Sequence, residues 1–290
     1  MNTGLSERIK NTQYSFSKGQ KLIASFILEH YDKVAFMTAS KLGKNVGVSE
    51  STVVRFATVL GYSGYPELQE AIQEMIRNRL TSVQRLEIID STLEYNLLLD
   101  RSMQQDLDVI ENTKQDINHE EFYKVAEEVS SCDTVYIIGA GSSSAIATFL
   151  YHYLNLIFDR VVLLDSSGEA AILAQLIKVK KNDAVIGISF PRYSKKVIKA
   201  LQFGLDKGAC VVAITDNLMS PIAVNSKHVL VTKSETVSFV DSLVAPLSLI
   251  NALIVTIAIN RKDKVVENLN KLEKIWDEYG VYEKIDEDET

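Results

Sequence analysis

The sequence predicts a two-domain protein of class α/β, with an all-α domain at the N-terminus and an α/β domain built on a five-stranded parallel sheet after it. The chain has 290 residues, of which 46% are hydrophobic, so it is longer than one typical domain and can bury a sizeable core. Before residue 80, apolar residues recur at helical spacing around glycine turns. After residue 133, short apolar runs alternate with helical segments, which is typical of a three-layer α/β/α arrangement.

Charge is unevenly divided between these regions. Residues 1–80 contain ten Lys and Arg against seven Asp and Glu, a net charge of +3. The whole chain has a formal charge of −7, which leaves −10 for the remainder. Only the N-terminal region is therefore suited to face a polyanion.

Three helices are expected in the N-terminal region. Ser17–Gln20 has the spacing of a capping box, and the apolar residues that follow predict a helix to about Tyr31. A second helix begins near Thr38 and ends at Gly47. A third runs over Glu50–Leu60, so that two short helices joined by a glycine turn form the layout of a helix-turn-helix.

The third helix has an apolar face and a polar face. The apolar face consists of Val53, Phe56, Ala57 and Leu60. The candidate DNA-binding residues are Ser49, which caps the helix, and the outer residues Ser51, Thr52, Arg55 and Thr58. Small hydroxyl side chains let such a helix enter a major groove, and an arginine can reach a guanine edge or a phosphate. A small helical bundle with a solvated face is the alternative.

One segment of this region resembles a known family. Val46–Leu68, with the sequence VGVSESTVVRFATVLGYSGYPEL, closely resembles the helix-turn-helix signature of the RpiR family of bacterial transcription regulators. The resemblance implies that the helix-turn-helix is joined to a sugar isomerase (SIS) domain.

The C-terminal region contains the predicted strands and helices of the sheet domain. The expected strands are Val135–Ile138, Val161–Leu164, Ala184–Ile188, Cys210–Ile214 and His228–Val231. The expected helices around them are His119–Val129, Ala145–Phe158, Ala170–Ile177 and Lys195–Lys207. In such sheets, ligands bind beyond the carboxyl ends of the strands.

The first of these strand ends is the main candidate for a phosphate site. Asp133–Ala145 combines a buried strand, a tight Gly139–Gly141 turn, three consecutive serines and an apolar helix. A helix N-terminus offers unpaired N–H groups and partial positive charge, and glycines let the backbone approach a ligand closely. Three serines in place of a third glycine favour a terminal phosphate over a pyrophosphate.

A second hydroxyl-rich loop, Ser189–Ser194, follows a later strand. The chain resembles the SIS domain, a phosphosugar-binding fold, over Phe122–Tyr279, and the family's two serine loops correspond to Gly141–Ser144 and Ser189–Ser194. Pro191 and Arg192 depart from the family pattern Ser-x-Ser-Gly-x-Ser/Thr, and Arg192 offers a cationic contact instead. The candidate effector-binding residues are Gly141, Ser142, Ser143, Ser144, Ser189, Arg192, Ser194 and Glu235.

Glu235 and the cysteine and histidine residues are further candidates for a functional role. Glu235 corresponds to a position where SIS isomerases carry a base, and it either contacts sugar hydroxyls or stabilises a helix N-terminus by its charge. Cys132 and Cys210 have no partner at metal or redox spacing, and the four histidines form no ligand pair, so no metal and no cofactor are expected. The polar N-terminus predicts a cytoplasmic protein, and the apolar run Leu243–Ile259 a buried or interface helix.

Three functions compete: a transcription regulator, a phosphosugar isomerase and a dinucleotide-binding oxidoreductase. An isomerase needs an acid and base pair, but no histidine lies on a strand-end loop. For the oxidoreductase, Asp165 stands where a ribose contact would lie, yet the third glycine is missing.

The regulator is favoured, and it is not expected to be an enzyme. Its predicted partners are operator DNA and a phosphorylated sugar, it forms a homodimer or homotetramer, and it has no membrane association. The expected organisation is a DNA-binding domain at 1–80, a helical linker at 81–117, the SIS domain at 118–280 and an acidic tail at 281–290.

Overall fold

The computed structural model describes residues 5–35, 37–77, 83, 86, 95–165, 167–234 and 240–283. The chain divides into two compact units, Met1–Ser91 and Thr92–Thr290, each of which is described by itself.

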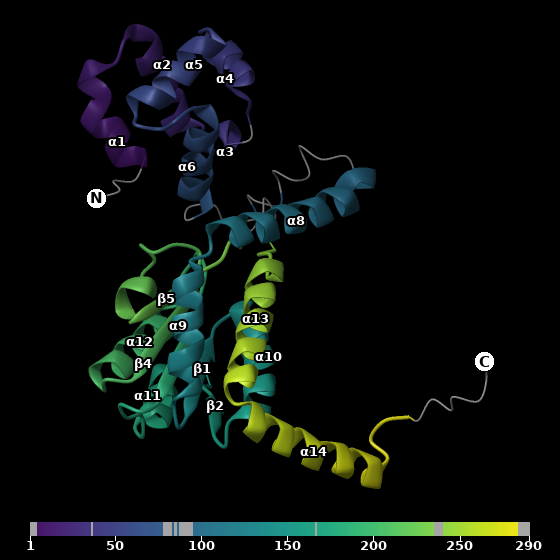
Figure 1. The fold of residues 1–290 in the computed structure, drawn as a ribbon. Helices are drawn as coiled ribbons and strands as arrows, with labels where there is room; N and C mark the ends of the chain where they lie inside the picture. Colours follow the sequence, from purple (N-terminus) through teal and green to yellow (C-terminus); the bar gives the residue numbers. More distant parts are fainter. Residues whose placement is uncertain are drawn as a thin grey trace, which may run out of the picture. The chain divides into compact units, whose positions relative to one another are not determined.

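The first unit is all-helical (Figure 1). Its helices are α1 (Leu5–Thr12), α2 (Lys18–Glu29), α3 (Tyr31–Val34), α4 (Ala39–Val46), α5 (Glu50–Val59) and α6 (Tyr65–Arg77). The capping box is confirmed at the start of α2, where Ser17 and Gln20 each accept a hydrogen bond from the other's backbone N–H. Thr38 caps α4, and Gly47 ends it with a φ of 76°, a conformation that favours glycine.

The apolar face of α5 forms the centre of this unit. Val53, Phe56 and Ala57 are fully buried, and Leu60 is almost so, as the spacing predicted. The rings of Phe56 and Phe16 lie 5.3 Å apart, which attaches α5 to the N-terminal segment. The polar face of α5 is thereby directed away from the core.

The second unit contains the predicted five-stranded, all-parallel sheet. The strands are β1 (Val135–Gly139), β2 (Val161–Leu163), β3 (Ala184–Ile188), β4 (Cys210–Thr215) and β5 (His228–Val231), in the order β2-β1-β3-β4-β5. The helices are α8 (Leu98–Asp116), α9 (His119–Ser130), α10 (Ser143–Ile157), α11 (Glu169–Leu176), α12 (Lys195–Asp206), α13 (Val244–Asn260) and α14 (Lys262–Tyr279). Every strand boundary lies within one residue of its prediction.

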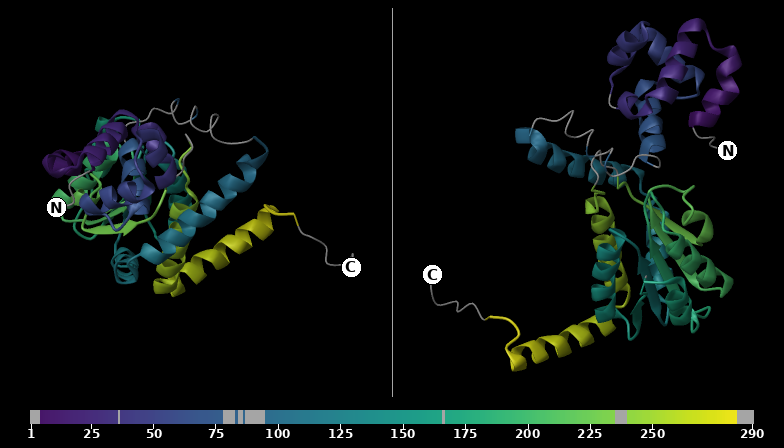
Figure 2. Two further views of the ribbon diagram at one scale, coloured as in Figure 1. Left: turned by 90° about the horizontal axis from the view of Figure 1, so that it is seen from above. Right: turned by 180° about the vertical axis from the view of Figure 1, so that it is seen from behind.

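Helices cover both faces of the sheet, which confirms the three-layer prediction (Figures 1 and 2). Side chains alternate across each strand, so Ile137 and Ile186 pack in a core with α9, α10 and α13. Their neighbours Tyr136 and Val185 pack in a second core with α11 and α12.

The long apolar helix α13 is buried on one side only. Seven of its residues face the interior of the unit, whereas Val255 and Ile259 are 57% and 67% exposed. Among the described residues no single helix is long and apolar enough to cross a membrane; α13 and α14 reach that length only as a pair bent by 101°.

Helix α8 lies within the segment expected to be a linker. It belongs to the second unit and packs against α13, and of its side chains Val109 and Thr113 are buried. Most of the segment before it, from residue 78 to residue 94, lies outside the described residues. The predicted helical character is confirmed for Leu98–Asp116.

We predict that Gly139→Ala destabilises the second unit. A Cβ at this position would lie 2.4 Å from the carbonyl oxygen of Ser143 and 2.9 Å from Cβ of Ala147, so α10 would have to move away from β1. Such overpacking costs about 1–3 kcal/mol of unfolding free energy, which urea denaturation measures. Gly168→Ala is the matched control, because nothing lies within 4 Å of a Cβ there. Equal stability of the two variants would contradict the prediction.

Candidate functional site

The two serine loops follow adjacent strands. Gly139 at the end of β1 pairs with Ile188 at the end of β3. Because the strands are parallel, Gly141–Ser144 and Ser189–Ser194 lie at the same edge of the sheet. The structure therefore brings together the two loops that the sequence singled out.

In the first loop, two of the three serine hydroxyls are accessible. Gly141 has a φ of 62°, which makes the turn tight, and α10 already begins at Ser143. Ser143 is 4% exposed, whereas Ser142 and Ser144 are exposed. Oγ of Ser144 donates to the carbonyl oxygen of Gly141 at 2.7 Å, and Oγ of Ser142 donates to Oδ2 of Asp241 at 3.3 Å. A ligand at this edge can thus reach Ser142 and Ser144.

The second loop is held by its first serine. Ser189 is 4% exposed, and its Oγ accepts a hydrogen bond from the backbone N–H of Ser194 at 3.1 Å. Ser194 is half-buried at the N-cap position of α12, where its side chain makes no capping hydrogen bond, while Arg192 is exposed. Ser189 therefore shapes the loop, and Arg192 lies on its accessible side.

A third strand end contributes a polar network that sequence reasoning missed. Asp216 directly follows β4 and is 8% exposed. Its Oδ1 accepts a hydrogen bond from the Tyr193 hydroxyl at 2.8 Å, and its Oδ2 accepts one from Nδ2 of Asn217 at 3.0 Å. An acidic residue directly after a buried strand was the available signal. The network links the Ser189–Ser194 loop to the end of β4.

Glu235 lies outside the described residues. On either side of it, the chain is attached to α8: the backbone N–H of Lys233 donates to Oγ1 of Thr113 at 2.9 Å, and Oγ of Ser242 donates to Oδ1 of Asp106 at 2.6 Å. Both contacts lie beyond the end of β5.

Asp165, the candidate ribose contact, is engaged in a local turn. Its carboxylate accepts hydrogen bonds from the backbone N–H of Ser167 at 2.8 Å and from the Ser167 hydroxyl at 2.9 Å. These two bonds lower the pKa of Asp165. Such turns commonly follow a strand and do not favour the dinucleotide alternative.

The candidate DNA-binding residues lie on the outer side of α5. Ser51, Arg55 and Thr58 are exposed, as is Ser49, while Thr52 is half-buried. Oγ of Ser49 accepts a hydrogen bond from the backbone N–H of Thr52 at 3.3 Å and so caps the helix. Nε of Arg55 donates to the carbonyl oxygen of Ser51 at 3.2 Å. The structure therefore presents these five residues along one helix and its cap.

The close packing of α4 against α5 depends on Gly43. A Cβ at this position would lie 2.8 Å from the backbone oxygen of Val48, in the turn between the two helices. Glycine allows the turn to approach α4 closely and so sets the path of the chain into α5.

Side chains of metal-ligating type gather at the opposite edge of the sheet, where β4 and β5 begin. They are Glu128, Cys210 and His228. No such group of three occurs at the serine loops among the residues that the structure describes.

We predict that Tyr193→Phe destabilises the second unit by about 1–3 kcal/mol, because it removes a hydrogen bond from the buried Asp216 carboxylate. Urea denaturation provides the measurement. Tyr123→Phe is the control, since Tyr123 is 60% exposed on α9. An unfolding midpoint for Tyr193→Phe equal to that of the control would show that the network contributes nothing to stability.

Each of the two units contains a segment that matches the model of a known protein family. Residues 3–79 match the model of the helix-turn-helix domain of the rpiR family, and residues 128–256 match the SIS domain model. Two relatives are named uncharacterized HTH-type transcriptional regulators. One from Clostridium perfringens is 24% identical, with 81% of this chain and 84% of the relative covered. The other, from Haemophilus influenzae, is 28% identical, with 77% and 78% covered.

Solved structures share the fold. The sugar isomerase domain of an RpiR transcription factor from Sphaerobacter thermophilus is 26% identical, with a TM-score of 0.58, and covers 61% of this chain and 99% of that domain. The Vibrio vulnificus NanR protein, complexed with ManNAc-6P, has a TM-score of 0.58 at 22% identity and covers 93% of this chain and 96% of that chain.

Proposed function

Because the chain is an RpiR-family protein, with a helix-turn-helix domain of that family joined to a SIS domain, we propose that it is a transcriptional regulator controlled by a phosphorylated sugar. The observation that carries the proposal is the pairing of an exposed, hydroxyl-rich α5 with two serine loops on adjacent strand ends.

We assign DNA recognition to α5. After Glu50 at its start, the outer side chains of α5 are short except for Arg55, so the helix can approach base edges closely. At the N-terminus of the helix, where phosphate oxygens are favoured, the Ser49 hydroxyl lies 2.9 Å from that of Ser51 and 2.8 Å from that of Thr52. The net charge of +3 over residues 1–80 supports the same partner.

We assign effector binding to the edge of the sheet formed by the two loops. Ser142 and Ser144 offer hydroxyl donors at the start of α10, and Arg192 offers a positive charge from the adjacent loop. Glu235 remains a candidate contact to sugar hydroxyls. NanR, which has the same fold, is complexed with ManNAc-6P, so an amino-sugar phosphate belongs among the first ligands to test.

A binding role is favoured over catalysis. Among the described residues, His152 lies on the exposed side of α10, and His228 is buried at the start of β5, so neither serves as the acid or base at the serine loops. The relatives are named transcriptional regulators, in agreement with a protein that senses its ligand.

The regulator acts in the cytoplasm as a dimer or tetramer. Paired half-sites on an operator require at least two copies of the helix-turn-helix. The exposed apolar residues Val255 and Ile259 of α13, with Val266 and Leu269 of α14, form a surface suited to contact a second copy. Ligand binding shifts the population between two arrangements of the DNA-binding domains.

For DNA recognition, we predict that Arg55→Ala weakens operator binding by about 1–3 kcal/mol, or roughly 5- to 150-fold, because it removes a contact to a base or phosphate. Gel-shift titration at fixed salt measures the affinity. Arg160→Ala, an exposed arginine of the second unit, removes the same charge and serves as the control. Unchanged affinity for Arg55→Ala would overturn the assignment.

For effector binding, we predict that a matching sugar phosphate stabilises the protein by roughly 2.7 kcal/mol when present at about one hundred times its dissociation constant. A thermal-shift screen of sugar phosphates, with ManNAc-6P included, identifies it, and nicotinamide dinucleotides test the oxidoreductase alternative. Ser142→Ala is expected to reduce the stabilisation and to preserve DNA binding, whereas the exposed Ser131→Ala preserves both. Stabilisation by dinucleotides alone would exclude the proposed effector class.

A further inference from the structure

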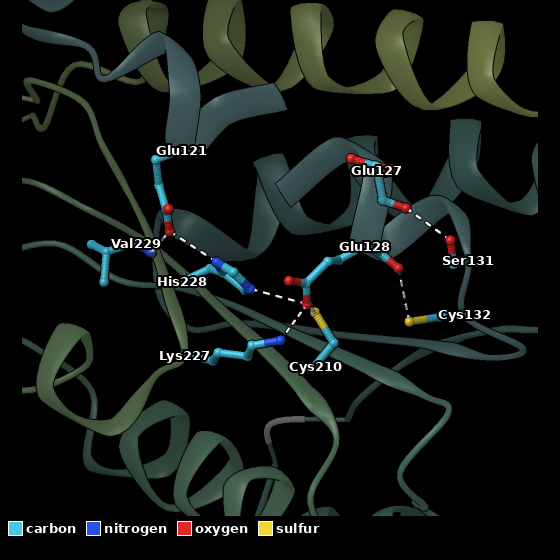
Figure 3. Close-up of polar contacts among 9 residues, drawn as sticks. All are labelled: Glu121, Glu127, Glu128, Ser131, Cys132, Cys210, Lys227, His228 and Val229. Carbon is cyan, nitrogen blue, oxygen red and sulfur yellow. Dashed lines mark hydrogen bonds and ion pairs between the residues drawn. The ribbon is translucent and has the colours of Figure 1, made fainter. Parts of the chain in front are cut away.

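A second group of polar side chains lies at the edge of the sheet where the strands begin (Figure 3). Glu121 and Glu128 are seven residues apart on α9, so they project from the same side of the helix. Cys210 is the first residue of β4, and His228 is the first residue of β5. His228 pairs with Val212 of the adjacent parallel strand β4, so Cys210, two residues before Val212, lies on the same face of the sheet as His228 and diagonally opposite it.

Three potential ligand atoms converge in this group. The ligand atoms of Glu128, Cys210 and His228 all lie within 4.8 Å of one another. Nε2 of His228 lies 3.1 Å from Oε2 of Glu128, and Sγ of Cys210 lies 3.7 Å from the same oxygen. His228 is 2% exposed and Cys210 is 8% exposed, whereas the side chain of Glu128 is 29% exposed and leaves one side of the group open to solvent.

The imidazole of His228 is oriented as in a metal site. Its Nδ1 lies 2.9 Å from Oε1 of Glu121, and a carboxylate can only accept, so Nδ1 carries the proton. The same Oε1 also accepts a hydrogen bond from the backbone N–H of Val229 at 3.3 Å, which holds the carboxylate in place. Nε2, on the other side of the ring, faces Oε2 of Glu128 at 3.1 Å and makes no well-aligned hydrogen bond within the described part of the chain. With Nδ1 as the donor to Glu121, Nε2 is the nitrogen that can offer a lone pair to an ion held between it and Glu128. A carboxylate on the outer nitrogen of a ligating histidine is a recurrent feature of metal sites.

We propose that Glu128, Cys210 and His228 bind a zinc ion, with Glu121 as the residue that positions the imidazole. One thiolate, one imidazole and one carboxylate are the ligands that Zn²⁺ takes in proteins, whereas Mg²⁺ and Ca²⁺ prefer oxygen alone. Three protein ligands leave the fourth tetrahedral position to a water molecule. The site lies at the edge opposite the serine loops and is independent of the effector.

A neighbouring lysine sets the conditions for binding. Lys227 forms an ion pair with Oε2 of Glu128 at 2.5 Å, and its side chain, which is 51% exposed, can move into solvent when the ion binds. Binding of the ion therefore displaces an ammonium group, and the thiol of Cys210 loses its proton because zinc binds the thiolate.

The test uses the full-length protein after removal of metals with a chelator. Zn²⁺ is titrated in competition with a chromogenic chelator, and we expect one ion per chain. We also expect a higher melting temperature with Zn²⁺ but not with Mg²⁺. Binding that is absent, or equal for the two ions, would overturn the proposal.

Substitution of the proposed ligands tests where in the protein the ion binds. Cys210→Ser and His228→Gln each remove a ligand and are expected to weaken Zn²⁺ binding by about 100-fold or more. His152→Gln, an exposed histidine of the same unit, is the control. If the buried variants fail to fold, Glu128→Gln at the open side of the group provides the same test. Full affinity in the ligand variants would place the ion elsewhere and reject the site.

Lys227→Met distinguishes a metal site from a structural ion pair. Removal of the competing ammonium is expected to strengthen Zn²⁺ binding by about tenfold. A lower affinity in this variant would contradict the proposed displacement. Glu121→Gln is expected to weaken binding by about 10–100-fold without removing a ligand.

Discussion

The parallel direction of the five strands is the constraint on which the rest of the second unit depends. Backbone hydrogen bonds align Gly139 with Ile188, so the loops that leave β1 and β3 emerge side by side. Such pairing is local to two strands, yet it joins loops almost fifty residues apart in the chain. The close contact of α10 with Gly139 then sets where its N-terminus and the accessible serines lie. Backbone geometry thus places the hydroxyls, and the side chains need only be small and polar.

Much of the fold was predictable because the relevant signals are local. Capping side chains at Ser17 and Thr38, and a glycine at Gly47, mark helix ends within a few residues. Apolar runs identified all five strands, most clearly the central β1, β3 and β4, because a strand buried on both faces leaves no polar positions. The polar side of α5 could be predicted as well, because helical periodicity is also a local signal.

Contacts between side chains on different strands could not be predicted, since they depend on the order of the strands in the sheet. Cys210 and Glu128 are 82 residues apart, and ligand spacing along the chain gave no reason to pair them or to add His228. The expectation that no metal binds rested on that spacing. Likewise, the contact between Tyr193 and Asp216 requires β4 to lie beside β3, and periodicity does not specify neighbours in a sheet. The Arg55→Ala and Ser142→Ala variants test whether the predicted site residues bind DNA and a sugar phosphate.

Helix α8 illustrates a further property of the second unit. Its contacts beyond β5 are made by Thr113 and Asp106, and only two of its nineteen residues are buried. Separation of this helix from the sheet would expose little apolar surface, so its local opening free energy is low compared with that of the strands. The amides of α8 are therefore expected to exchange with solvent faster than those of the central strands. Because α8 directly precedes α9 in the chain, its opening would leave the core between α9 and the sheet intact.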